Sequence, residues 1–265
     1  MEHTLHGITE ALERGLLAEE LSRRSGLFQS LDGRVKVVGV LALLLSVSMS
    51  RNLAVIASTY GLALVLAWLS AIPPMLLIRR VWIALPFFTG LIVLPALFLT
   101  PGPSLAALPW GLAITRTGMM TSLFLVLRVS ASLSLTLLLI LTTPWNAVLS
   151  ALRILRVPDT FVLILGMTYR YIYLLLHAAN DMFLSRQSRL VGRLSTAEHQ
   201  RMLAAIGGAL LGKSLKMSSE VYMAMLSRGF RGTIMPLRPP RMLSMDWLWM
   251  IVLSGLATVG IVLGR

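Results

Sequence analysis

Between Asp32 and Asp159 the sequence contains no Asp or Glu, although this stretch is nearly half of the 265 residues. Most of it consists of long apolar runs with Lys and Arg gathered at their ends, which is the pattern that the positive-inside rule produces. Mean hydropathy is +0.80 and 13% of the residues are charged, whereas soluble domains carry about 25%. The chain is therefore expected to cross a membrane several times.

The apolar runs predict an all-α membrane protein with about five transmembrane helices. Residues 1–34 form an N-terminal amphipathic segment, and the first four spans fall within residues 35–141. Pro86 and Pro95 predict a kink in the third of them, and the uncharged segment 101–115 is expected to be an external loop. The expected spans cover residues 35–50, 53–71, 81–100, 117–141 and 246–263.

Residues 142–241 are expected to form a cytoplasmic module of long, crossing amphipathic helices. Within it, residues 160–179 are apolar enough to be a span, but crossing there would place residues 186–241 outside the membrane. That segment has ten Lys and Arg against two Glu, so the positive-inside rule favours a non-spanning helix. We therefore expect a multi-pass protein of the cell (inner or plasma) membrane with a cytoplasmic N-terminus.

The first four spans contain neither carboxylates nor His, the groups on which proton- or sodium-driven carriers usually depend. A stand-alone secondary carrier is therefore the less favoured function. There is no Cys, and we expect no metal site in the membrane core. No paired carboxylates or nucleophile–base set indicates an enzyme. The net charge of +13 follows from topology, so we expect the lipid bilayer and not nucleic acid as a partner.

Arg128 lies near the middle of the fourth span with no carboxylate in the first four spans to pair with it. Burying Arg there costs about 2.5–3.5 kcal/mol on the insertion scale. One hypothesis is therefore an intramembrane functional residue. The alternative is an Arg that bonds to carbonyl groups, or to Ser130 and Ser132, within the helix bundle.

Residues 207–214 match the phosphate-binding pattern GxxxxGK[ST]. A working phosphate loop must follow a buried strand, whereas the flanking residues here have the period of one long helix. The glycines have a second explanation, because Ala204, Gly208 and Gly212 are spaced by four. Such a small-residue stripe favours a close crossing of two helices, and we predict the helix crossing there.

Two tripeptides with a central Arg, Ser185-Arg186-Gln187 and Ser227-Arg228-Gly229, each follow a long helical run. A single Arg at such a position would be explained by the positive-inside rule alone. Two of them, each at the end of a long amphipathic helix, favour docking into acidic pockets of a partner. Gly229 and Gly232 also suit a helix C-cap.

At these residues the chain resembles the transmembrane T component of energy-coupling factor (ECF) transporters, the EcfT/CbiQ family, in particular its cobalt-transport type. Ser227-Arg228-Gly229-Phe230 is similar to the family's Ala-Arg-Gly-Phe. Ser185-Arg186-Gln187 departs twice from Ala-Arg-Gly, so only Arg186 carries over. Arg170-Tyr171-Ile172 resembles Arg-Phe/Tyr-Ile. Asp32-Gly33-Arg34-Val35-Lys36 resembles Asp-Pro-Arg-x-Lys, with Gly33 in place of Pro. The resemblance covers nearly the whole chain.

The resemblance implies a non-catalytic coupling subunit of an ATP-driven importer, most simply for Co²⁺. Arg186 and Arg228, with Ser185, Ser227 and Gly229 beside them, would dock on two cytosolic ABC ATPase subunits that hold ATP and Mg²⁺. Residues 142–241 would be the coupling domain, and a separate membrane component would bind the substrate. This chain would then need no cofactor of its own. Nickel or vitamin transport by a T component remains the alternative within the family.

Overall fold

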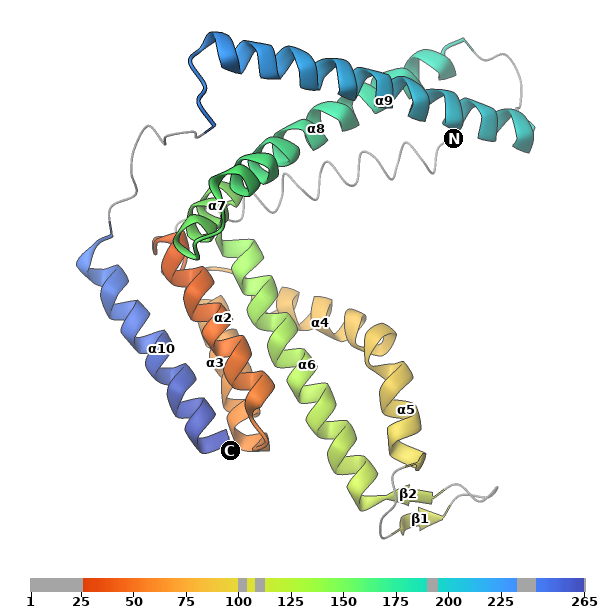
Figure 1. The fold of residues 1–265 in the computed structure, drawn as a ribbon. Helices are drawn as coiled ribbons and strands as arrows, with labels where there is room; N and C mark the ends of the chain where they lie inside the picture. The colour runs from red at the N-terminus through yellow and green to blue at the C-terminus, as the bar shows by residue number, and fades with distance from the viewer. Residues whose placement is uncertain (1–25, 100–103, 108–112, 190–194, 233–241, 265) are drawn as a thin grey trace. The chain divides into compact units, whose positions relative to one another are not determined.

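The computed structural model describes residues 26–99, 104–107, 113–189, 195–232 and 242–264. Within these residues the chain forms nine α-helices and one two-stranded hairpin, so the expected helical fold is confirmed (Figure 1). The chain divides into two compact units. The bundle unit comprises the described residues of Ala18–Ala151 and Pro240–Arg265. The other unit comprises those of Leu152–Pro239 and is called the α8–α9 unit after its helices α8 (Asp159–Gln187) and α9 (Thr196–Ser227).

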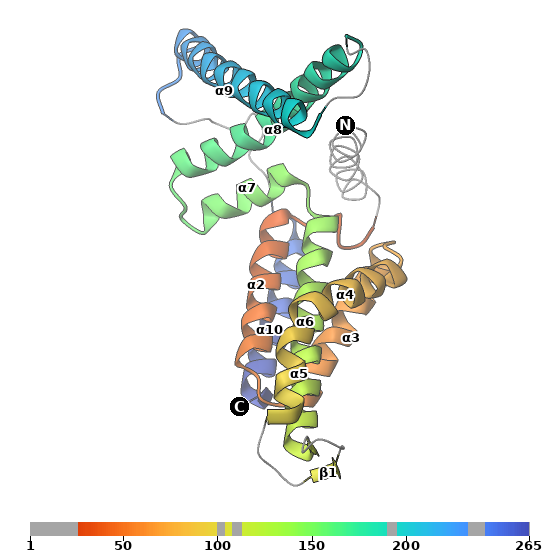
Figure 2. The ribbon, with the colours of Figure 1, turned by 90° about the vertical axis from the view of Figure 1, so that its right-hand side faces the viewer.

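Four helices of the bundle unit match predicted spans to within a few residues. Three of them begin at a polar N-cap, since the side chains of Asp32, Asn52 and Thr115 each accept a hydrogen bond from a backbone N–H in the following first turn. The helices lie side by side in both views (Figures 1 and 2). They are α2 (Gly33–Met49), α3 (Leu53–Leu69), α6 (Arg116–Thr142) and α10 (Ser244–Gly264).

The third apolar run differs from the single kinked helix expected over residues 81–100. It forms α4 (Pro74–Phe88) and α5 (Gly90–Leu99), separated at Thr89. Pro86 lies in the last turn of α4, and a proline there lacks the backbone N–H that would hydrogen-bond within the helix. At 15 and 10 residues the two helices rise about 22 and 15 Å, so neither alone covers a hydrocarbon core of about 30 Å.

The expected external loop contains a short antiparallel hairpin, β1 (Ser104–Ala107) paired with β2 (Ala113–Thr115). Nothing in the alternation of this uncharged, Pro-containing segment had indicated strands. The hairpin connects α5 to α6. Thr115, the last residue of β2, is also the N-cap of α6.

Three described helices are long and apolar enough to cross a membrane: α6, α10 and α8 (Asp159–Gln187); α3 is a shorter apolar helix. The candidacy of α8 rests on length and composition, as it did in the sequence. In the structure α8 packs against α9 (Thr196–Ser227), and the two belong to a unit distinct from the bundle. The number of spans and their orientation stay a prediction.

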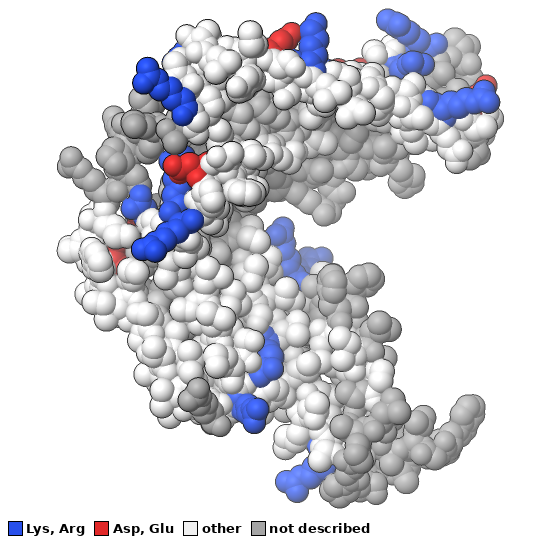
Figure 3. All heavy atoms as spheres, viewed as in Figure 1, with Lys and Arg blue, Asp and Glu red and all other residues white. Residues whose placement is uncertain are grey.

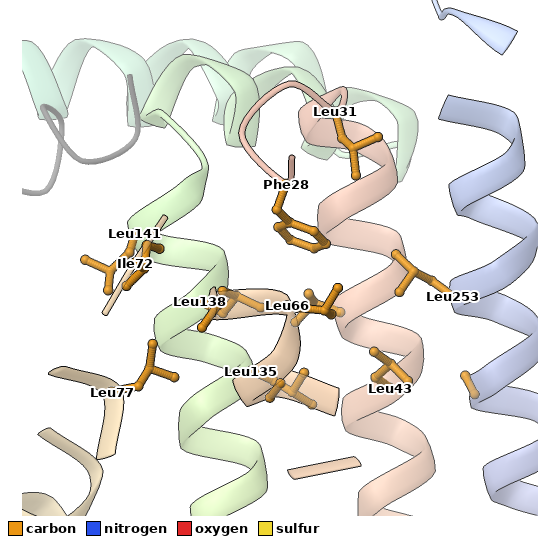
Figure 4. Packing of buried hydrophobic residues seen from close by; sticks show 14 residues of the cluster. Phe28, Leu31, Leu43, Leu66, Ile72, Leu77, Leu135, Leu138, Leu141 and Leu253 are labelled. Atoms are coloured by element: carbon orange, nitrogen blue, oxygen red, sulfur yellow. The ribbon is translucent and has the colours of Figure 1, made fainter. Parts of the chain in front are cut away.

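Leucine side chains from several helices fill the core of the bundle unit (Figure 4). Phe28 and Leu31, which precede α2, close its end, and each is at most 5% exposed. Since lipid tails are as apolar as Leu, this packing stabilises the bundle through close contact more than through escape from solvent. The labelled core side chains of the helices are Leu43, Leu66, Leu77, Leu135, Leu138, Leu141 and Leu253, with Ile72 between α3 and α4.

The contact between α2 and α10 depends on glycine. A Cβ built on Gly39 would lie 2.5 Å from the Leu253 side chain, and one on Gly264 would lie 3.0 Å from the Ser50 backbone. The Arg51 N–H also donates to the Gly264 carbonyl at 2.6 Å. Within the bundle unit, small residues therefore bring α2 and α10 into close contact.

Candidate functional site

The second Arg motif forms the C-terminal cap of α9. Arg228 is the C-cap residue, and Gly229 follows with φ +81°, a left-handed conformation that favours glycine. The Gly229 N–H donates to the Leu226 carbonyl at 2.9 Å and the Phe230 N–H donates to the Met225 carbonyl at 3.0 Å. These two bonds are the Schellman motif, so the expected glycine C-cap is confirmed at Gly229.

The same motif separates the surroundings of its charged and aromatic side chains. Phe230 is half-buried and, with Met225, lines the space between α8 and α9. Arg228 is exposed and forms no ion pair with any described residue. Ser227 donates its hydroxyl to the Ala224 carbonyl at 2.9 Å, so it binds its own helix. The cap thus fixes the backbone while leaving the guanidinium open to solvent.

Arg186 occupies the last turn of α8, where a cation is favoured by the helix dipole. Its side chain is exposed, and within the described residues it has no acidic partner. Ser185 donates to the Met182 carbonyl at 3.0 Å. Gln187 closes the helix without the positive-φ glycine found at the other motif, so the two ends differ in geometry.

The two helices meet close to Arg186 and far from Arg228. Phe183 of α8 packs against Met202 and Ile206 of α9, and each of the three is 5–6% exposed. Arg228 follows Ile206 by 22 residues, which corresponds to about 33 Å of helix. The structure therefore presents two separate exposed Arg side chains and does not bring them into one site.

Ala204, Gly208 and Gly212, the residues predicted to form a helix crossing, lie outside the described contact between α8 and α9. All three residues are exposed, and a Cβ on either glycine would have no described atom within 4 Å. The contact instead uses the neighbouring stripe that begins at Met202 and Ile206. The larger side chains of this stripe bury more apolar surface than the small residues would, and this area favours Met202 and Ile206 as the face that turns toward α8.

The residues that match the phosphate-loop pattern, 207–214, lie in the interior of α9. Their backbone groups are part of a continuous helix, and Ser214 donates its hydroxyl to the Leu211 carbonyl at 2.8 Å. A phosphate loop needs free backbone N–H groups after a strand. The interpretation of this segment as helix is confirmed.

An apolar groove of about 490 Å³ runs between the first half of α8 and the second half of α9. It contains no charged lining residue, and its hydroxyl groups come from Thr168, Ser214, Ser218 and two Tyr. This groove was not among the features predicted from the sequence, although apolar residues at spacings of three and four on both helices carry its signal. Among its lining residues are Leu163, Met167, Tyr171, Met217, Val221 and Met225.

Charge on the α8–α9 unit is predominantly positive, and blue side chains outnumber red ones on the face seen in Figure 3. Two described ion pairs use acidic residues of this unit, Arg153–Asp159 at 3.7 Å and Lys216–Glu220 at 3.9 Å. Glu198 is engaged in a capping box with Ser195, and hydrogen bonds from the Ser195 backbone and hydroxyl lower the pKa of Glu198. Among the described residues, neither Arg186 nor Arg228 forms an ion pair.

Arg128 binds within the bundle. Its guanidinium donates to the Ser50 carbonyl, at the C-terminal cap of α2, and lies 4.7 Å from the centre of the Phe124 ring. An end-of-helix carbonyl lacks an intrahelical donor, so this bond satisfies it. Of the two hypotheses for Arg128, the geometry agrees with the structural one.

Among the described residues, no group of three or more His, Cys, Asp and Glu could hold a metal ion. His177 and His199 lie on different helices of the α8–α9 unit. Within the described residues, the α8–α9 unit therefore presents exposed cations, a helix contact and an apolar groove, which are features of binding surfaces.

Comparison with known proteins agrees with this arrangement. A family model described as "Cobalt transport protein" (CbiQ) matches residues 25–238. An uncharacterized protein of Methanocaldococcus jannaschii is 34% identical over 88% of this chain and 81% of its own length. The cobalt transport protein CbiQ of Rhodobacter capsulatus is 30% identical over 57% of this chain and 62% of its own length. The nickel permease LarQ of Lactiplantibacillus plantarum is 29% identical over 74% and 65%.

Proposed function

The chain belongs to the CbiQ family of cobalt transport proteins, and on that premise we propose that it is the energy-coupling membrane subunit of an ATP-driven metal importer. In this proposal two cytosolic ABC ATPase subunits bind ATP and Mg²⁺, and a separate membrane component binds the metal. The observation that carries the proposal is the exposed Arg228 on a rigid helix cap, with a second exposed Arg at the end of α8.

Arg228 and Arg186 are the proposed attachment points for the two ATPase subunits. Charge-assisted hydrogen bonds of this kind contribute about 1.5–3 kcal/mol each. Arg186 lies near the contact between α8 and α9, whereas Arg228 lies about 33 Å of helix beyond it, and this separation favours two contacts on two subunits over one shared pocket. Arg228 is the firmer anchor of the two, because its backbone is fixed by the Schellman bonds.

The contact of Phe183 with Met202 and Ile206 is the proposed link between the two attachment points. If the ATPase subunits move together on binding ATP, the two helices must shift at this contact. The motion is then passed to the membrane helices and reorients the substrate-binding component.

The apolar groove is the proposed seat of that substrate-binding component. A groove of about 490 Å³ with no charged lining residue is a poor match for the acidic pocket that would take an Arg. It suits the apolar surface of another membrane protein. In this arrangement the Arg side chains bind the ATPases, and the groove binds the membrane partner.

Cobalt is the first candidate for the substrate and nickel the second, following the names of the family and of two relatives. Both relatives extend beyond the matched region, which covers 62% and 65% of their lengths. A T component shared by vitamin-binding partners is the further alternative. This chain's described residues offer no metal-ligand cluster, so selectivity would lie in the partner.

The proposal is tested by expressing the chain with the products of its neighbouring genes and purifying the assembly through a tag on this chain. We expect ATPase subunits and a second membrane protein to co-purify. We also expect Co²⁺ uptake into vesicles that contain the assembly to require added ATP. Uptake of Ni²⁺ or of a vitamin in place of Co²⁺ would reassign the substrate. Uptake by this chain alone, driven by an ion gradient, would overturn the proposed function.

A further inference from the structure

A network of buried polar groups holds together the beginnings of α2 and α10. Asp246 is 4% exposed and accepts two hydrogen bonds, from the Asp32 N–H and from the Leu243 N–H, both at 2.9 Å. Asp32 in turn caps α2 by accepting from the Arg34 N–H at 3.0 Å. Both carboxylates thus lie at helix N-termini, where negative charge is favoured.

Lys36 ties the same point to the end of α6. It is 1% exposed, and its ammonium group donates to the Gln29 carbonyl at 3.2 Å and to the Thr142 carbonyl at 3.1 Å. Thr142 is the last residue of α6, so its carbonyl has no partner within the helix. The Phe28 ring lies 5.9 Å below the charge. Burying the charge of a Lys costs free energy unless hydrogen-bond partners compensate it. The two carbonyl groups therefore stabilise Lys36 at this position.

Gly33 completes the arrangement by admitting α7 (Trp145–Ile154). A Cβ built on Gly33 would lie 2.6 Å from the Cβ of Ala147 and 3.1 Å from its carbonyl oxygen. The start of α7 therefore rests directly on the first turn of α2. Gly33 stands where the related Asp-Pro-Arg-x-Lys pattern has Pro, and Ala147 occupies the space beside it.

The position of α7 in the chain gives the network its consequence. Up to residue 151 α7 belongs to the bundle unit, and from Leu152 the chain belongs to the α8–α9 unit. Any movement of the α8–α9 unit that travels through this connection reaches the bundle at the Gly33–Ala147 contact. At that contact, residues at the start of α2 are hydrogen-bonded to α6 through Lys36 and to α10 through Asp246.

We infer that Asp32, Gly33, Lys36 and Asp246 form a force-transmitting joint, through which movement of α7 is passed to α2, α6 and α10. The inference rests on the proposed function, because it assumes that the α8–α9 unit is driven by ATPase subunits. These four are positioning residues: they would neither bind substrate nor dock a partner, but would determine how much of the movement reaches the membrane helices.

The test uses the complete transporter and measures metal taken up per ATP hydrolysed. With Lys36→Met, Asp246→Asn or Gly33→Ala we expect ATPase subunits to remain bound and ATP hydrolysis to stay within about threefold. Uptake per ATP should fall about tenfold, since the ATPases would move a poorly connected helix. Leu66→Ala is the matched control: it destabilises the bundle core without touching the joint, and should leave the ratio unchanged.

A rescue separates transmission from stability. Ala147→Gly removes the side chain that a new Cβ at position 33 would meet at 2.6 Å and leaves the backbone contacts at 3.1 Å, so the Gly33→Ala, Ala147→Gly double variant should recover part of the ratio. Unchanged ratios in all three single variants would overturn the joint and leave the proposed function standing. So would loss of assembly that the double variant does not restore. Absence of ATPase subunits from the wild-type assembly would instead contradict the proposed function.

Discussion

At the scale of single residues, the Arg228-Gly229-Phe230 motif divides three roles among three neighbours. Gly229 adopts the backbone angle that ends α9, Phe230 turns back into the groove, and Arg228 stays exposed. The sequence identified the Arg and the glycine cap. It did not reveal that the aromatic residue belongs to the groove, because that contact depends on where α8 lies.

Gly229→Ala should lower the free energy of unfolding of the α8–α9 unit by about 1–2 kcal/mol, since an L side chain at φ +81° is strained. Gly207→Ala is the matched control on the same helix. Gly207 is exposed and has no described atom within 4 Å of an added Cβ, so this change should raise stability by about 0.5–1 kcal/mol. Denaturant unfolding of the purified chain in detergent measures both. Equal effects would contradict the assigned cap.

Glu198 should make the start of α9 sensitive to acid. Its pKa is lowered in the folded chain by bonds from Ser195, so its contribution is complete above the usual value of 4.5 and declines as the pH falls through the folded pKa. Amide hydrogen exchange of the first turn of α9, measured at decreasing pH, should show loss of protection in this window beyond the intrinsic pH effect. Glu198→Gln should remove that dependence, and its persistence in the variant would exclude Glu198 as the cause.

At the scale of helices, the sequence predicted helix positions best where a polar N-cap residue precedes a long apolar run. Asp32, Asn52 and Thr115 mark such ends, and α2, α3 and α6 begin where expected. It failed at α4 and α5, because Pro86 was read as a kink and the structure has a full break. On α9, a stripe of small residues and a stripe of larger apolar residues both have the period of a helix. The sequence favoured the small residues, which lie outside the described contact with α8. The helical period shows which residues share a face of the helix. Which of two such faces is buried depends on the position of the neighbouring helix.

The choice between the two stripes of α9 can be measured. Ile206→Ala should destabilise the α8–α9 unit by about 2 kcal/mol, because it removes buried contacts with Phe183. Gly208→Gln, two residues away, should be neutral or stabilising, since the site is open and Gln is a better helix former. Thermal unfolding in detergent distinguishes the two. Destabilisation by Gly208→Gln equal to that by Ile206→Ala would restore the crossing that the sequence had predicted.

A second pair of variants tests the seam between the first and last helices of the bundle. Gly39→Ala should cost about 1–3 kcal/mol, since its Cβ would lie 2.5 Å from Leu253 in a filled interface. Gly61→Ala makes the same change in the interior of α3, where no described atom lies within 4 Å, and should not destabilise. Thermal unfolding of both in the same detergent is the measurement. Equal midpoints would mean that α10 does not pack on α2 as closely as described.

At the scale of the whole molecule, the chain combines a glycine-seamed helix bundle with a basic pair of long helices. The pattern of charges and apolar runs predicted a division into two parts, because the long apolar runs and the basic segment occupy different stretches of the chain. The sequence could not supply the contacts at Lys36, Asp246 and Gly33, which join residues more than 100 positions apart. Such contacts follow from packing and have no local signal.

Binding of the ATPase subunits to Arg228 is the central claim, and charge reversal tests it most directly. We predict that Arg228→Glu lowers the affinity of the tagged chain for its ATPase subunits by about 10- to 150-fold, the equivalent of about 1.5–3 kcal/mol. Lys213→Glu, an equal charge change in the exposed middle of α9, should retain wild-type affinity. Undiminished binding by Arg228→Glu, with Co²⁺ uptake still driven by ATP, would contradict the claim.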